Sequence, residues 1–192
     1  SGRRVRRVPV SDGPVHAAAF TSSTGAPRLA VLTNNRSIQF WDPETEDRVG
    51  ELQVGETAPG SRLATWCTPS GRPRVAVIRG DTGIRVLDPE AGEEGGMPLI
   101  GHEGAATDLT TWRTPDGQLR LASSGDGVTL LWDPETGRRV GRLEGPREWL
   151  SSVTAHTAPE RTLLVVIDKD GGYTLWDPDA EQQVASHRLP VG

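Results

Sequence analysis

The sequence predicts an all-β chain made of four repeated units, each with four short antiparallel strands. A strand that ends in Trp-Asp-Pro or Leu-Asp-Pro recurs with its last apolar residue at Trp41, Leu87, Trp132 and Trp176, at intervals of 46, 45 and 44 residues. The apolar runs between these points are short and bounded by Gly and Pro, and none has the 3.6-residue periodicity of a helix. A fixed period of this length is typical of a repeat architecture.

The four repeats are expected at about 11–54, 55–100, 101–144 and 145–192, after a strand-like segment over 2–10. Their strands, in order, are expected at 15–20, 28–33, 37–42 and 48–54; at 62–67, 74–79, 83–88 and near 97–100; at 106–112, 119–123, 128–133 and 139–143; and at 150–156, 162–167, 173–177 and 183–189.

Turn residues explain why neighbouring strands form hairpins. Thr68–Gly71 and Thr114–Gly117 both place Pro at the second turn position, where its fixed φ is already correct, and Gly where φ is positive. Asp133–Gly137 has the same design between the third and fourth strands. Glu46 and Glu181 replace this Gly in the first and last repeats, so looser turns are expected there.

The paired residues Trp41-Asp42, Leu87-Asp88, Trp132-Asp133 and Trp176-Asp177 resemble the signature of the WD-repeat (Trp-Asp repeat) β-propeller family. The resemblance covers essentially the whole chain. It implies that each repeat is one propeller blade of four antiparallel strands, with four blades per chain. Four blades are fewer than a family ring usually holds, and a two-fold axis would join two chains into an eight-bladed ring.

The segment Gly2–Val10 favours such self-association. Its sequence GRRVRRVPV is similar to GRRVGRLEG at Gly137–Gly145, which the resemblance places in the outermost strand of a blade. The chain therefore has five outermost strands for four blades. We expect Arg3–Val10 of one chain to complete blade 4 of a partner in a homodimer and to displace the partner's own C-terminal strand. The alternative is a fragment of a longer propeller with exposed ends.

A buried polar network is implied in the third repeat. By position, the family resemblance assigns it to His102, Ser124, Asp126 and Trp132. In such a network the carboxylate orients the imidazole, and the imidazole contacts the hydroxyl. The hydroxyl in turn accepts a hydrogen bond from the indole N–H. Few buried polar groups would then remain unsatisfied. The other repeats keep this set only in part. A nucleophilic triad is disfavoured, because the set lies between strands and no oxyanion site is implied.

Composition and spacing argue against several other classes of function. Asp168-Lys169-Asp170-Gly171 begins like a calcium loop, but its twelfth position lies beyond a strand. The histidines and Cys67 lack zinc-ligand spacing, so no metal or other cofactor is expected. A net charge of −5 argues against nucleic acid and membranes as partners. A single cysteine and the lack of a long apolar run predict a cytoplasmic protein. The basic run of Arg3, Arg4, Arg6 and Arg7 is interpreted as edge-strand protection.

The predicted function is a non-catalytic scaffold for protein–protein interactions. In the resembled family, partners dock where the connections between blades and the turns between second and third strands open. The candidate binding residues there are Arg36, Arg79, Arg147, Trp149 and Lys169. An exposed Trp-Arg pair is typical of interaction hot spots. The expected partners are a second copy and an unidentified protein. A small-ligand or glycan-binding propeller is the alternative, and it would need equivalent aromatic residues in every repeat.

Overall fold

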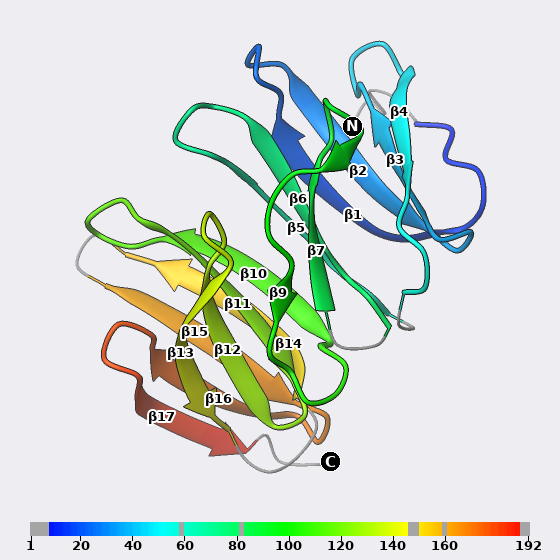
Figure 1. Cartoon of the computed structure of the whole chain (residues 1–192). Helices are drawn as coiled ribbons and strands as arrows, with labels where there is room; N and C mark the ends of the chain where they lie inside the picture. Colours follow the sequence, from blue (N-terminus) through cyan, green and yellow to red (C-terminus); the bar gives the residue numbers. More distant parts are fainter. Residues whose placement is uncertain (1–7, 58–59, 81–82, 146–149, 159–160, 189–192) are drawn as a thin grey trace, which may run out of the picture.

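The computed structural model describes residues 8–57, 60–80, 83–145, 150–158 and 161–188, and these residues form strands and turns with no helix. Four antiparallel sheets follow one another along the chain, which confirms the all-β prediction (Figure 1). Each sheet is one blade, and its strands run a to d in chain order from one edge to the other.

The strand bounds are as follows. Blade 1 contains β1 (Pro14–Thr21), β2 (Pro27–Thr33), β3 (Ser37–Trp41) and β4 (Arg48–Gln53). Blade 2 contains β5 (Leu63–Cys67), β6 (Pro73–Ile78), β7 (Gly83–Asp88), β8 (Glu93–Glu94) and β9 (Leu99–Ile100). Blade 3 contains β10 (Asp108–Arg113), β11 (Leu119–Gly125), β12 (Val128–Asp133) and β13 (Arg138–Glu144). Blade 4 contains β14 (Leu150–Thr157), β15 (Thr162–Asp168), β16 (Gly172–Asp177) and β17 (Gln182–Arg188).

The aspartate of each repeat signature forms the turn between strands c and d. The Asp42 and Asp133 carboxylates accept hydrogen bonds from the backbone N–H two residues on, at 2.8 and 3.0 Å. Asp88 and Asp177 do the same at 3.0 Å each. This side-chain turn explains why an aspartate recurs after every strand c.

The fourth strand of blade 2 differs from the prediction of one strand near 97–100. It is split into β8 and β9, which both pair with β7. Gly95 lies between them and donates its N–H to the Val86 carbonyl at 2.9 Å. A Cβ at Gly95 would lie 2.5 Å from the backbone nitrogen of Asp88. This close approach needs glycine, and it interrupts the regular strand.

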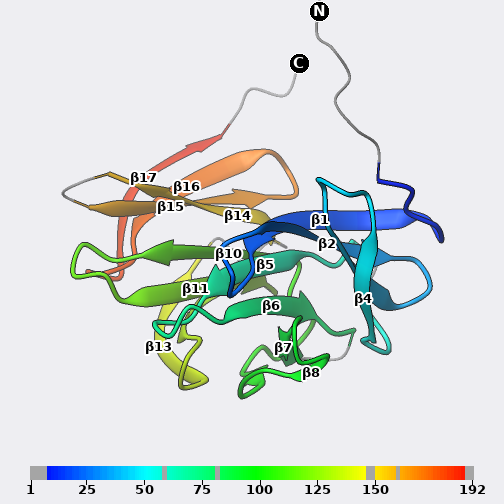
Figure 2. The same ribbon diagram turned by 90° about the horizontal axis from the view of Figure 1, so that it is seen from above.

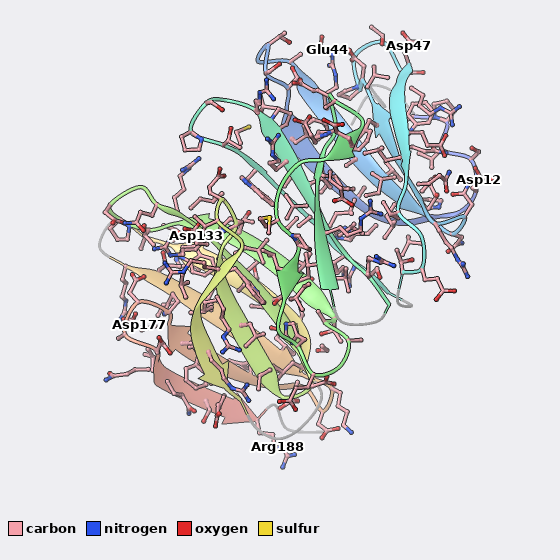
Figure 3. All side chains as sticks on the ribbon, in the orientation of Figure 1. Asp12, Glu44, Asp47, Asp133, Asp177 and Arg188 are labelled. Carbon is pink, nitrogen blue, oxygen red and sulfur yellow. The ribbon has the colours of Figure 1, made fainter. Side chains whose placement is uncertain are left out.

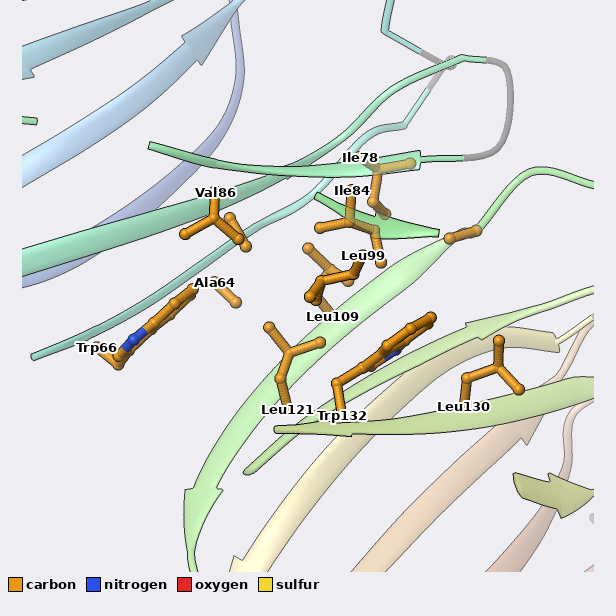
Figure 4. Close-up of a cluster of buried hydrophobic side chains, with 12 residues drawn as sticks. Ala64, Trp66, Ile78, Ile84, Val86, Leu99, Leu109, Leu121, Leu130 and Trp132 are labelled. Carbon is orange, nitrogen blue, oxygen red and sulfur yellow. The ribbon is translucent and has the colours of Figure 1, made fainter. Parts of the chain in front are cut away.

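Three hydrophobic clusters fill the joints between consecutive blades. The joint between blades 2 and 3 packs Trp66, Ile84 and Leu99 against Leu121 and Trp132 (Figure 4). The other two clusters join blade 1 to blade 2 and blade 3 to blade 4. Among the described residues no such cluster joins blade 4 to blade 1. The blades therefore form an open arc (Figure 2).

The inner a strands hold this arc together through side chains that bond to the next blade. Thr65 donates its hydroxyl to the Ala19 carbonyl at 2.7 Å, and Thr111 donates to the Thr65 carbonyl at 3.2 Å. Asp108 accepts the Val153 N–H at 2.9 Å. Because these bonds repeat from blade to blade, they fix the register of neighbouring sheets as well as their packing.

Blade 4 is complete within the single chain. Its strand d is β17, which pairs with β16 from Gly172 to Asp177. The chain's own C-terminal strand therefore occupies the place that sequence analysis assigned to Arg3–Val10 of a partner. Residues 3–7 of that segment lie outside the described residues, and Val8–Val10 are not in a strand. Displacement of β17 is thus not needed to complete the blade.

Candidate interaction rim and the polar network beneath it

One end of the arc carries the turns between strands b and c and the connections between blades; we call this end the rim. The opposite end carries the turns between strands c and d, and its acidic residues include Glu44, Asp47, Asp133 and Asp177 (Figure 3). Asp12 and Arg188 project on the rim side. The two ends therefore present different side chains to a partner.

The described candidate binding residues all lie on the rim, each in the b–c turn of a different blade. Arg36 is exposed, has a φ of 65° and lies 3.5 Å from the Glu56 carboxylate. Arg79 is half-buried, and its N–H donates to the Gly83 carbonyl at 2.9 Å. Lys169 is exposed. Arg147 and Trp149 lie outside the described residues. The three cationic side chains, Arg36, Arg79 and Lys169, therefore lie at the same end of the arc and do not contact one another.

Beneath the rim, blade 3 holds a buried hydrogen-bonded network. His102 Nε2 lies 2.7 Å from the Ser123 hydroxyl, which also accepts the Trp132 indole N–H at 2.8 Å. The prediction of Ser124 in this network is wrong. Ser123 pairs with Leu130 across the sheet and shares the face of Trp132, whereas Ser124 faces the other way and bonds to Thr129 at 2.9 Å. Adjacent strand residues point to opposite faces, so a shift of one residue changes the partner.

Asp126 contributes charge rather than a hydrogen bond to this network. Its carboxylate occupies the space where a Cβ on Gly104 would lie. Among the described residues, no group bonds to His102 Nδ1. Burial lowers the pKa of His102 below its ordinary value, and the nearby Asp126 carboxylate and the bond to Ser123 offset part of that decrease. Neutral His102 is therefore favoured in the folded protein.

Blades 1 and 4, which also carry the signature tryptophan, lack a hydroxyl side chain at the position equivalent to Ser123. Strand pairing places Val31 there in blade 1 and Val166 in blade 4. The Trp41 indole N–H is consequently buried without a hydrogen-bond partner among the described residues. Only blade 3 has the hydrogen-bonded His-Ser-Trp set in the described part of the chain. Sequence comparison of the repeats could have identified this difference, because both valines are visible at the aligned positions.

A groove of about 570 Å³ lies between the outer strands of blades 3 and 4. Its lining combines acidic, amide, hydroxyl and basic side chains: Glu144, Asp168, Thr174, Gln183, Ser186 and Arg188. The Asp168 carboxylate accepts the N–H groups of Asp170 and Gly172 at 2.9 and 2.8 Å, so it closes the b–c turn. Tyr173 and His187 also line the groove, where their rings stack with centroids 5.6 Å apart.

The described residues hold no cluster of three or more His, Cys, Asp or Glu side chains that could bind a metal ion. They also contain no helix long and apolar enough to cross a membrane.

The strand order and the stacking of the sheets are those of a β-propeller, of which this chain forms four blades. In all, 1127 solved chains are similar to it. One is described as "Structure of U3-55K", with a TM-score of 0.69 and 16% sequence identity. The match covers 93% of this chain and 53% of that chain, so the present chain spans about half of that protein. At this identity the likeness shows the fold alone. No protein-family model and no curated protein matches the sequence.

Proposed function

We propose that the protein is a non-catalytic, cytoplasmic scaffold that binds a protein partner through its rim. The observation that supports this most directly is the placement of Arg36, Arg79 and Lys169, which lie in b–c turns of three blades at one end of the arc. Flexible turns held by stiff sheets are a common arrangement for binding surfaces.

We also propose that the open arc self-associates. Within the described ranges, blades 1 and 4 each pack against one other blade only, since the three clusters join consecutive blades of the chain. A repeat unit buries its faces by stacking, and terminal repeats without a polar cap favour association. Two chains related by a two-fold axis would supply eight blades, and reciprocal contact between the open ends would close the ring.

Charge reversal on the rim tests the scaffold proposal. The variant Arg36→Glu with Lys169→Glu changes two exposed turn residues, and Arg72→Glu is the matched control in an exposed a–b turn at the opposite end. Partners captured from cell extract by the native protein are expected to be lost with the rim variant and retained with Arg72→Glu. Equal capture by all three proteins, each confirmed as folded by circular dichroism, would refute binding through the rim.

A further inference from the structure

The outer edge of blade 4 differs from the outer edges of the other blades. In a blade, strand d exposes unpaired backbone N–H and C=O groups that can pair with a foreign strand, and charged side chains normally discourage this. Charged residues are present along β4, β8 and β13: Arg48 and Glu51; Glu93 and Glu94; Arg138, Arg139, Arg142 and Glu144. The edge of β17 has no charged residue from Gln182 to His187.

This edge is also accessible. Six of the seven residues of β17 are exposed, and Val184 has an exposed fraction of 47%. β17 is the outermost strand of its sheet, at the margin of the arc (Figure 1). Its one charged residue, Arg188, lies at the strand end, 4.0 Å from the Asp170 carboxylate. An exposed strand edge without charge is suited to strand addition, in which main-chain hydrogen bonds supply affinity.

The polar groove beside β17 has acidic groups that would favour a basic strand. Glu144 and Asp168 line it together with one basic residue, Arg188, and the Glu144 side chain, which lies 3.3 Å from Arg142, is 77% exposed. The chain itself contains a basic segment with β-strand character, GRRVRRVPV at Gly2–Val10. Residues two apart point to the same side of a strand, so Arg4 and Arg6 of an added strand would face one side together. The groove carboxylates and the unpaired backbone edge of β17 therefore both favour Gly2–Val10 as the added strand.

We propose that the edge of β17 is a strand-addition site for Gly2–Val10 of a second copy, which adds as a fifth strand of blade 4. The proposal rests on the self-association proposed above. It differs from the exchange expected from the sequence because β17 stays in place. In a closed two-chain ring, blade 1 of each chain would lie next to blade 4 of the other, so the segment that precedes blade 1 would begin beside this edge. Two reciprocal additions would satisfy the two-fold symmetry.

A lysine on the edge strand provides the test. Val184→Lys places a charge on the exposed edge, where it opposes strand addition and repels the arginines. Val140→Lys is the matched control: Val140 occupies the equivalent bulge position in β13 and is 43% exposed. The probe is a fluorescently labelled peptide with the sequence of residues 1–10, and binding to the full chain is followed by anisotropy at low and high salt.

The peptide competes with the Gly2–Val10 segment of the second copy, so it is added in excess; the native chain and Val140→Lys are then expected to bind it with equal apparent affinity that weakens in high salt. Val184→Lys is expected to weaken binding at least about tenfold, the change that corresponds to loss of one or two backbone hydrogen bonds. Equal binding by Val184→Lys and the native chain, or no binding by either, would overturn the proposed site. Sedimentation equilibrium of the same proteins separates the two proposals. A Val184→Lys dimer as tight as the native dimer would retain self-association but reject strand addition, whereas a monomeric native chain would reject both proposals.

Discussion

At the scale of single residues, the side chain that matters most to blade 3 is Ser123. Its hydroxyl contacts both His102 and Trp132 and is fully buried. Ser123 and Ser124 point to opposite faces of the strand, so only one of them can join the network. The sequence could identify the composition of the network, but it could not decide between Ser123 and Ser124, since both are small and polar. The register with β12 decided it.

Replacement of this serine gives a direct prediction. Ser123→Ala would leave the Trp132 indole N–H and His102 Nε2 buried without their partner, at a cost of about 1–3 kcal/mol for each unsatisfied group. We expect the free energy of unfolding to decrease by about 2 kcal/mol or more, measured by urea denaturation with tryptophan fluorescence. A stability equal to that of the native protein would show that the hydroxyl does not hold these groups.

At the scale of strands and turns, the repeat signature was largely predictable because its residues have local roles. Each signature aspartate closes its own turn, and the repeat period fixed the order of the blades. At Glu46 and Glu181, where looser turns are predicted, both residues adopt positive φ, at 65° and 51°, like Gly137 at 72°. The split edge of blade 2 was not predictable, because it depends on how closely Gly95 approaches β7.

The joint between β1 and β5 depends on a neutral histidine. His16 Nδ1 accepts the Leu63 N–H at 3.1 Å, which a doubly protonated imidazole could not do. Burial and then the nearby Arg62 lower the pKa of His16 below its ordinary 6.5, while Asp108 opposes this. The unfolded chain therefore binds a proton at a higher pH than the folded chain. Stability is expected to be fully present above pH 6.5 and to fall as the pH decreases below it, and His102 acts in the same direction.

The free energy of unfolding should therefore be lower at about pH 5.5 than at about pH 7.5. His16→Gln keeps an acceptor near the Leu63 N–H without a titrating group, so its stability should change less over this range. The comparison requires urea unfolding curves for both proteins at both pH values. A native protein whose stability stays constant or rises on acidification, or a variant with an undiminished decrease, would contradict this role of His16.

At the scale of the whole molecule, the described residues form an arc of four blades, and a hydrophobic cluster fills each joint between consecutive blades. Sequence analysis predicted the blades and the shared position of the rim turns. It could not predict that blade 4 would be completed by β17, since two segments of the chain have the character of a strand d. Because β17 already completes blade 4, the contact proposed with a second copy is addition of a strand at the edge of β17 rather than replacement of β17. The groove beside β17 shares Asp168 with the b–c turn of blade 4, so the proposed partner surface and the proposed site for a second copy adjoin each other.

Absolute molar mass by light scattering on a sizing column, over a hundredfold range of concentration, tests the central claim that this open arc completes its propeller with a second copy. The account predicts a constant mass of twice 20.6 kDa. A constant mass of 20.6 kDa would contradict it, as would species that grow steadily with concentration.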